Sequence, residues 1–185
     1  MPTHGKRKEI VLRRNRDDGF TLVELIVVVL VIGILLAVAV PTFLGARNRA
    51  HNRAAQSDLR SALVGAKAIF SGNGSYICAR TANGAVAPCV GIGMPSVESS
   101  LVYVAAGTAS TVALPRVSIS TTTAPTWAAA RMSKTGTCYK IRDVMTPVGT
   151  PPILTTVGTW YGQSTTNCTG TSAMTTGNTL LKRWT

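Results

Sequence analysis

One segment of the sequence constrains the fold more than any other. From Leu25 to Val40 the chain carries no charged side chain, and Gly33 is the only interruption of the apolar run. As a helix, residues 20–40 would extend ~31 Å, about the thickness of the hydrocarbon core of a bilayer. A carboxylate, Glu24, stands at the start of this segment. Charged side chains in a membrane are costly and usually functional, so Glu24 requires an explanation.

The residues before this segment are polar and basic. Six lysines and arginines precede Gly19, namely Lys6, Arg7, Lys8, Arg13, Arg14 and Arg16. A basic stretch before an apolar run is typical of a secretory signal peptide, and residues 37–39 offer a cleavage site of the A-x-A kind. The run is long for such a peptide, however, and Glu24 would have no purpose in it. A signal anchor explains the length but not Glu24, and its orientation is weakly specified because four arginines follow the run.

Beyond Pro41 the pattern changes from apolar all round to amphipathic. Apolar residues recur at helical spacing at Leu44, Ala55, Leu59, Ala62, Leu63, Ala66, Ile69 and Phe70. This spacing predicts that residues 42–71 continue the helix with one buried face. Pro41 predicts a kink near residues 37–41, and the glycines and asparagine of residues 72–74 predict the end of the helix.

The remainder, residues 72–185, indicates a β-rich head. Short β-prone runs lie at 101–105, 111–114, 116–121, 127–132, 137–142 and 159–161. These runs are separated by Gly, Pro, Ser and Thr, and they predict an antiparallel sheet of about four or five strands. We expect the apolar face of this sheet to pack on the stripe of Leu59, Leu63, Ala66 and Phe70. The polar segment at 171–179 is assigned no structure. The predicted class is α+β: a long bent N-terminal helix on a small antiparallel sheet.

All four cysteines follow the apolar run. No C-x-x-C occurs. The only histidine beyond residue 19, His51, is distant in sequence and lies in a helical stretch, so disulfides in an oxidising compartment fit better than zinc. Of the three pairings we favour Cys78–Cys89, which closes a short loop rich in turn residues, and Cys138–Cys168, which holds down the last part of the chain. A loop of the second size is worth ~3 kcal/mol in the chain-entropy model.

The charge balance is strongly basic, at +12. After Gly19 there are thirteen basic residues against four acids. Those expected in the head are Arg116, Arg131, Lys134, Lys140, Arg142, Lys182 and Arg183. One hypothesis is that this outward-facing set binds DNA without sequence preference and more weakly as salt rises. The favoured alternative is that these charges solvate the surface or bind acidic glycans. The cations from Arg47 to Lys67 would pair with lipid headgroups.

The sequence offers no catalytic constellation, cofactor motif or metal cluster. His51 stands alone without a positioned partner, and too few acids follow Gly19 for a paired-carboxylate or calcium site. We therefore expect no enzyme activity, no cofactor and no metal.

The stretch GFTLVELIVVVLVIGILLAVAVPTF resembles the class III signal of type IV pilins and pseudopilins, and the likeness extends from Gly19 to about Phe70. It implies that residues 1–19 are a leader, which a prepilin peptidase removes between Gly19 and Phe20 before methylating the Phe20 amine. It further implies residues 20–41 as a transmembrane and filament-core helix. Assembly with other copies of the chain, driven by membrane machinery, is also implied.

The same resemblance assigns roles within the helix. Glu24 would pair with the Phe20 amine of its own or a neighbouring subunit and so set the register of assembly. The helix around Gly33 and Pro41 would lose helical structure as subunits assemble. The alternatives are a Glu24 that snorkels at the headgroup boundary and a static kink at Pro41.

The function expected from these features is that of a structural subunit. The chain would sit in the cytoplasmic membrane, held by lipid with its head outside, and then form an extracellular type IV pilus. The alternatives are a pseudopilin of a type II-like secretion system and a signal-anchored secreted β-domain protein. The lack of an acidic cluster counts against the calcium-binding major pseudopilin. Adhesion, motility, DNA uptake and secretion are not distinguished.

Overall fold

The computed structural model describes residues 19–81, 84, 89–146, 156–175 and 181. Residues 1–18 of the expected leader, which comprises residues 1–19, lie outside these residues. The chain divides into two compact units, residues 1–43 and residues 44–185, which are described separately. The helix α1 (Leu22–Asn73) contributes its first part to one unit and its second part to the other.

In the first unit, α1 has no apolar cover. Every residue from Leu22 to Phe43 is exposed, and the large apolar side chains among them are at least 49 % exposed. Within the described residues, α1 is the one helix long and apolar enough to cross a membrane. It stays helical through Pro41, and the hydroxyl of Thr42 donates to the Ala39 carbonyl at 2.8 Å. A helix that is apolar all round must be covered by lipid or by other helices.

In the second unit, the expected amphipathic stripe is present. The buried residues of α1 are Ala55, Leu59, Ala62, Leu63, Gly65, Ala66 and Ile69. The helix ends where residues 72–74 predicted, because Gly74 adopts a left-handed φ of 65° and its N–H donates to the Phe70 carbonyl at 2.7 Å. This C-terminal cap satisfies a carbonyl that the last turn would leave without a partner.

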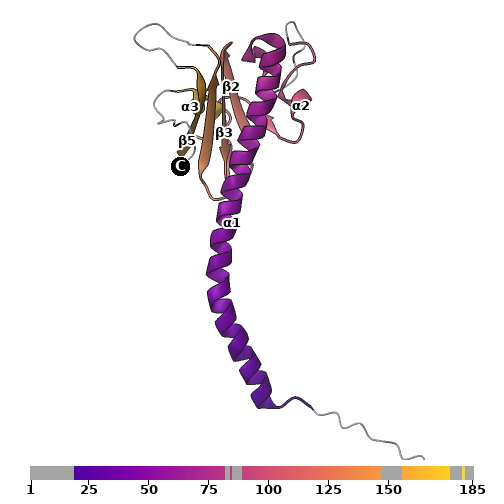
Figure 1. The fold of residues 1–185 in the computed structure, drawn as a ribbon, viewed down its shortest axis with the longest axis vertical. Coiled ribbons are helices and arrows are strands. Elements are labelled where there is room, and N and C mark those ends of the chain that lie inside the picture. Colours follow the sequence, from indigo (N-terminus) through magenta and orange to yellow (C-terminus); the bar gives the residue numbers. More distant parts are fainter. Residues whose placement is uncertain (1–18, 82–83, 85–88, 147–155, 176–180, 182–185) are drawn as a thin grey trace, which may run out of the picture. The chain divides into compact units, whose positions relative to one another are not determined.

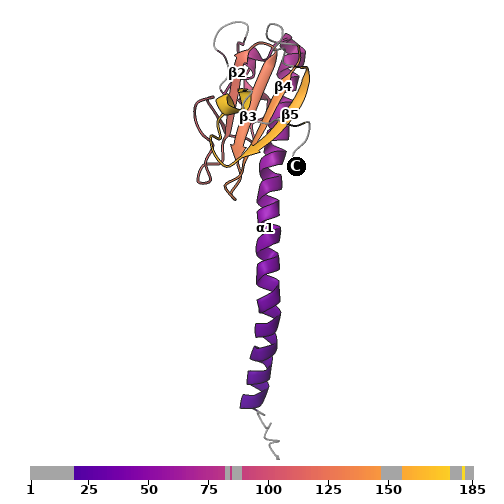
Figure 2. The ribbon, with the colours of Figure 1, turned by 90° about the vertical axis from the view of Figure 1, so that its left-hand side faces the viewer.

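The head is a five-stranded sheet in the order β1-β2-β3-β4-β5. Its strands are β1 (Tyr103–Val104), β2 (Val117–Thr123), β3 (Thr126–Met132), β4 (Cys138–Val144) and β5 (Gly158–Ser164). Short helices η1 (Tyr76–Cys78), α2 (Met94–Val97) and α3 (Gly170–Met174) complete the fold. The second part of α1 packs on one face of the sheet and α3 on the other (Figures 1 and 2).

The two faces of the sheet follow from the alternation of side chains along β3. Trp127 and Ala129 point to the cluster that includes the α1 stripe, whereas Ala128 and Ala130 point to the cluster beneath α3. Alanine at these positions lets a helix approach each face closely. The whole strand from Thr126 to Ala130 is therefore buried.

The α+β class is confirmed, with three differences in detail. β1 pairs with β2 in parallel, so the sheet is mostly but not wholly antiparallel. The expected strand at 111–114 is instead a local turn, because the N–H of Leu114 donates to the Thr111 hydroxyl at 3.1 Å. Residues 171–174, expected to lack structure, belong to α3. The Thr169 hydroxyl caps α3 by accepting from the Ser172 N–H at 3.0 Å.

Both disulfides have the pairing favoured by the loop argument. Cys78 is joined to Cys89 and Cys138 to Cys168. The first bond ties η1 to the chain that leads into α2. The second ties the start of β4 to the segment before α3, so it fixes the short α3 on its face of the sheet.

A buried carboxylate connects four elements of the head. Asp143 of β4 is 1 % exposed and accepts hydrogen bonds from the Tyr76 and Thr159 hydroxyls, each at 2.5 Å. Lys67 of α1 places its Nζ 3.2 Å from the same carboxylate. A buried carboxylate is tolerated only when its oxygens are satisfied in this way. Burial and the bond to Asp143 also raise the pKa of Tyr76, so this phenol remains a donor.

Two further polar links hold α1 on the sheet. Asn52 Oδ1 accepts from the Ser133 hydroxyl at 2.7 Å and from the Thr135 hydroxyl at 2.5 Å, both in the turn between β3 and β4. Asp58 forms an ion pair with Arg131 of β3. Partial burial raises the pKa of Asp58, and the charge of Arg131 opposes that rise. With Lys67, these links fix which turn of the helix meets which strand.

We predict that Asp143→Ala lowers the free energy of unfolding of the head by about 3 kcal/mol, because it leaves buried hydroxyls without an acceptor. The matched change Asp58→Ala should cost about 1 kcal/mol, since that pair is partly solvated. Denaturant unfolding with the disulfides intact, followed by fluorescence of the fully buried Trp127 beside Asp143 in the β3–β4 register, measures both. Equal losses in the two variants would contradict the role given to Asp143.

Candidate functional site

The start of α1 is closed by a reciprocal pair of hydrogen bonds. The Thr21 hydroxyl accepts from the Glu24 N–H at 3.2 Å. In return, Glu24 Oε2 accepts from the Thr21 N–H at 3.0 Å and from the Thr21 hydroxyl at 2.9 Å. This is a capping box, in which a threonine and a glutamate three residues later satisfy each other's backbone N–H groups. It gives Glu24 a role within its own chain.

The capping box lies wholly after the expected cleavage site. Phe20 is 85 % exposed, and a side chain added at Gly19 would meet no atom within 4 Å. Cleavage between Gly19 and Phe20 would leave Thr21 and Glu24 bonded to each other and would place a new amine one residue before the cap. The carboxylate of Glu24 lies at the N-terminus of the helix, where backbone N–H groups favour an anion.

Sequence reasoning missed this cap, although its signal is present. Thr21 and Glu24 have the spacing of the capping-box signature immediately before an apolar run. The cost of a charge in a membrane instead directed the interpretation of Glu24 toward a partner in another subunit. The two roles are compatible, because Oε2 takes the cap hydrogen bonds and a carboxylate has a second oxygen.

The helix is unbroken at the two positions expected to change on assembly. α1 is continuous through Gly33 and Pro41, and Gly33 has open space where a side chain would be. Loss of helical structure there concerns the assembled state and stays a prediction.

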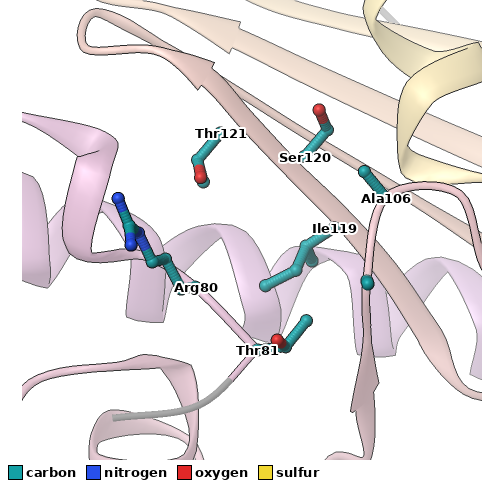
Figure 3. A pocket seen from close by; sticks show the side chains of 7 residues that line it. Arg80, Thr81, Ala106, Ile119, Ser120 and Thr121 are labelled. Carbon is teal, nitrogen blue, oxygen red and sulfur yellow. The ribbon is translucent and has the colours of Figure 1, made fainter. Parts of the chain in front are cut away.

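A pocket of about 280 Å³ lies along the outer edge of β2 (Figure 3). It is lined by Arg80, Thr81, Ala105, Ala106, Ile119, Ser120 and Thr121. β1 pairs only with Val117 and Ser118, so this edge of β2 has no strand beside it from Ile119 onward among the described residues. Arg80 Nε donates to the Ile77 carbonyl at 2.6 Å. The lining offers hydrogen bonds and one positive charge, but no acid–base pair.

A second pocket, of about 320 Å³, lies between α1 and α2. Its lining residues are Ser57, Arg60, Ser61, Val64, Gly65, Ala68, Val97 and Glu98. Val64 is 69 % exposed beside this groove of small side chains. Among the described residues there is no group of three or more His, Cys, Asp or Glu side chains that could hold a metal ion.

The expected outward-facing basic surface of the head is wrong for three of its members. Lys140 is 1 % exposed, on the sheet face that carries α3, and burial lowers the pKa of its ammonium group. Arg142 is half-buried and donates to the Met174 carbonyl at 3.1 Å, and Arg131 is held by Asp58. Successive side chains of β3 and β4 point to opposite faces of the sheet, so these three lie under α3 or α1. The count of charges in the sequence did not indicate this burial. Lys182 and Arg183 lie outside the described residues.

Comparison with known proteins identifies the N-terminal segment. A family model described as the prokaryotic N-terminal methylation motif matches residues 14–40. The matched range includes the capping box and nearly all of the exposed apolar helix. This segment is similar to the N-terminal segment of type IV pilin-like proteins.

Two curated relatives match more of the chain. It is 39 % identical over 61 residues to the type IV major pilin protein PilA of Myxococcus xanthus, a match that covers 33 % of this chain and 28 % of the relative. It is 38 % identical over 48 residues to the type II secretion system core protein G of Aeromonas hydrophila, covering 26 % of this chain and 34 % of the relative. The chain thus spans about a third of the length of these relatives. No solved structure matches it significantly.

Proposed function

We propose that this pilin-like chain is the structural subunit of an extracellular type IV pilus. The observation that carries the proposal is a coincidence of sequence and structure. The segment matched by the methylation motif is also the segment whose apolar side chains have no cover in their own chain. A helix of this kind is stable in a bilayer, and on leaving the bilayer it needs other helices around it.

The proposal includes the processing of the precursor. A prepilin peptidase cuts between Gly19 and Phe20 and methylates the Phe20 amine, after which assembly machinery in the cytoplasmic membrane adds the subunit to the fibre. Supporting this step, the site is exposed and a charged leader precedes it. Before assembly, residues 22–43 span the cytoplasmic membrane with the head outside, where the oxidising environment suits the two disulfides.

In the assembled fibre Glu24 has two functions. It caps its own α1, and it pairs with the positive amine of Phe20 in the same or an adjacent subunit. A charge pair in an apolar filament core fixes the axial register, as single buried polar residues do in coiled coils. The cap holds the carboxylate near the start of the helix, so it is in place before a neighbouring amine arrives.

The role we propose is mechanical rather than catalytic. The four acids that follow Gly19 all have partners within the chain. His51 lies on α1 among arginines, without a carboxylate partner in the described residues. The side chains at these positions therefore serve as structural groups of a fibre and not as reacting groups.

A second candidate is a pseudopilin that forms a short fibre within a type II-like secretion system. The likeness to core protein G of Aeromonas hydrophila favours it. The two candidates share the processed N-terminus and differ in the product, because a pilus extends from the cell surface and a pseudopilus does not.

We predict that the mature chain begins at Phe20 and carries a methylated amine. Intact-mass and N-terminal peptide analysis of the membrane and sheared surface fractions measures both features. A chain that begins near Val40 would indicate a signal peptidase instead. A chain that retains Lys6 or Arg7 would indicate an uncleaved anchor.

We predict that Glu24→Ala leaves cleavage intact but abolishes fibres, because it removes the partner of the Phe20 amine and not the scissile bond. Thr21→Ala is the matched control, since it removes the hydroxyl of the cap and keeps the carboxylate. It should lower fibre yield only partly. Pulse-labelled processing and the yield of sheared fibres are followed in parallel.

The two variants separate the two functions of Glu24. Equal loss of fibres in both would mean that capping alone explains the requirement for this glutamate. Normal fibre yield from Glu24→Ala would remove the docking role altogether.

A further inference from the structure

Three exposed arginines lie in the first turns of the second unit. Arg47, Arg49 and Arg53 all follow closely on Phe43, the last residue of the apolar unit. Two residues turn an α-helix by about 200°, so Arg47 and Arg49 leave α1 on opposite sides, and Arg53 lies near the side of Arg49. We call these three residues the arginine collar, because they surround the helix rather than form one face.

Among the residues that the structure describes, the collar has no counter-charge. Four acids follow Gly19, and all four are among the described residues. Asp58 pairs with Arg131, and Asp143 pairs with Lys67. Glu24 caps α1, and Glu98 accepts from the Ser100 N–H at 3.1 Å. No ion pair joins any of these acids to the collar within the part of the chain that the structure describes.

A second copy of the chain is a poor source of the missing charge. Thirteen basic residues follow Gly19, and two of the four acids are already paired with cations inside each copy. Neighbouring copies would therefore bring more positive than negative charge to the collar. A net positive charge therefore remains at the collar, and a molecule rich in anionic groups is better suited to neutralise it.

The position of the collar indicates which molecule this is. The collar begins four residues after the apolar segment that is suited to a bilayer core. The headgroup layer adds roughly 5–8 Å on each side of that core, and helical residues 44–53 rise ~15 Å. Arginine side chains lay their stems along apolar surface and extend their guanidinium groups to phosphate, which they bind with paired hydrogen bonds.

We propose that the arginine collar binds the phosphates of anionic lipids at the outer surface of the membrane. Bound there, the collar holds the subunit with its head close to the bilayer until assembly begins. The proposal rests on the membrane-spanning state given to the precursor and mature chain under the proposed function. Each cation near an anionic surface strengthens binding roughly fivefold, so three together give a marked preference for anionic over zwitterionic lipid.

The test uses the full chain in vesicles that contain equal amounts of phosphatidylglycerol and phosphatidylcholine. After mild detergent extraction, mass spectrometry measures the ratio of the two lipids that remain bound. The test variant is Arg47→Gln/Arg49→Gln/Arg53→Gln. The matched control is Arg80→Gln/Arg116→Gln/Lys134→Gln, which removes the same charge from exposed positions of the head.

The native chain and the head variant should retain phosphatidylglycerol in at least about fivefold excess. The collar variant should show no preference, and high salt should remove the preference of the native chain. Equal loss in both variants would show that net charge alone acts, and would overturn the proposal. Capture of duplex DNA by the native chain in purely zwitterionic vesicles would also overturn the proposal, if the collar variant no longer captures the DNA.

Flotation of the vesicles separates this proposal from the proposed function. All three proteins should float with the lipid, because the apolar helix is unchanged. A native chain that floats without lipid preference contradicts the collar alone. A native chain that does not float contradicts the membrane-spanning state and the collar with it.

Discussion

The account of this protein depends on one constraint: the first half of α1 is apolar on all sides, and nothing in its own chain covers it. From Leu22 to Phe43 every side chain is exposed. Burying such a surface is favourable by about 25 cal/mol per Å² of apolar area, so the helix will not stay in water. Lipid and the helices of other copies are the two environments that can cover it, and the proposed filament subunit exchanges the first for the second.

The second half of α1 has the opposite character, because its chain supplies the cover. An apolar stripe packs on the sheet, and Asn52, Asp58 and Lys67 each form a polar link to a β-strand or to the turn between strands. The apolar contacts supply the attraction, whereas the polar links determine the register of helix and sheet. Asp143 is the centre of this arrangement, since it joins α1, η1, β4 and β5. The head is thus fixed to the part of α1 that follows the apolar segment.

Much of this organisation could be predicted from the sequence, because it follows from strong local patterns. The apolar run, the amphipathic stripe and the glycine at the end of α1 each have a mechanism that acts within a few residues. The β-prone runs at 101–105, 116–121, 127–132, 137–142 and 159–161 each contain or overlap one of the five strands. The run at 111–114 did not, because the Thr111 hydroxyl gives the backbone of this segment a local partner.

The features that were missed depend on contacts between distant segments. Nothing local shows that Lys140 is buried beneath α3 while Lys134 is exposed, since both are lysines in or beside β-strands. The longest direct contact in the network around Asp143 is the ion pair from Lys67 to Asp143, 76 positions apart, and no pattern of single residues encodes it. The capping box is the exception, because Thr21 and Glu24 were recognisable by their spacing alone.

The central claim is that this chain builds a surface fibre around its apolar helices. Electron microscopy of fibres from cells with and without the chain, with helical reconstruction, tests it most directly. The account predicts fibres that disappear when the chain is absent, with residues 22–43 of many copies packed at the axis and the sheets outside. Unchanged fibres in its absence, or a fibre core built from other residues, would contradict it.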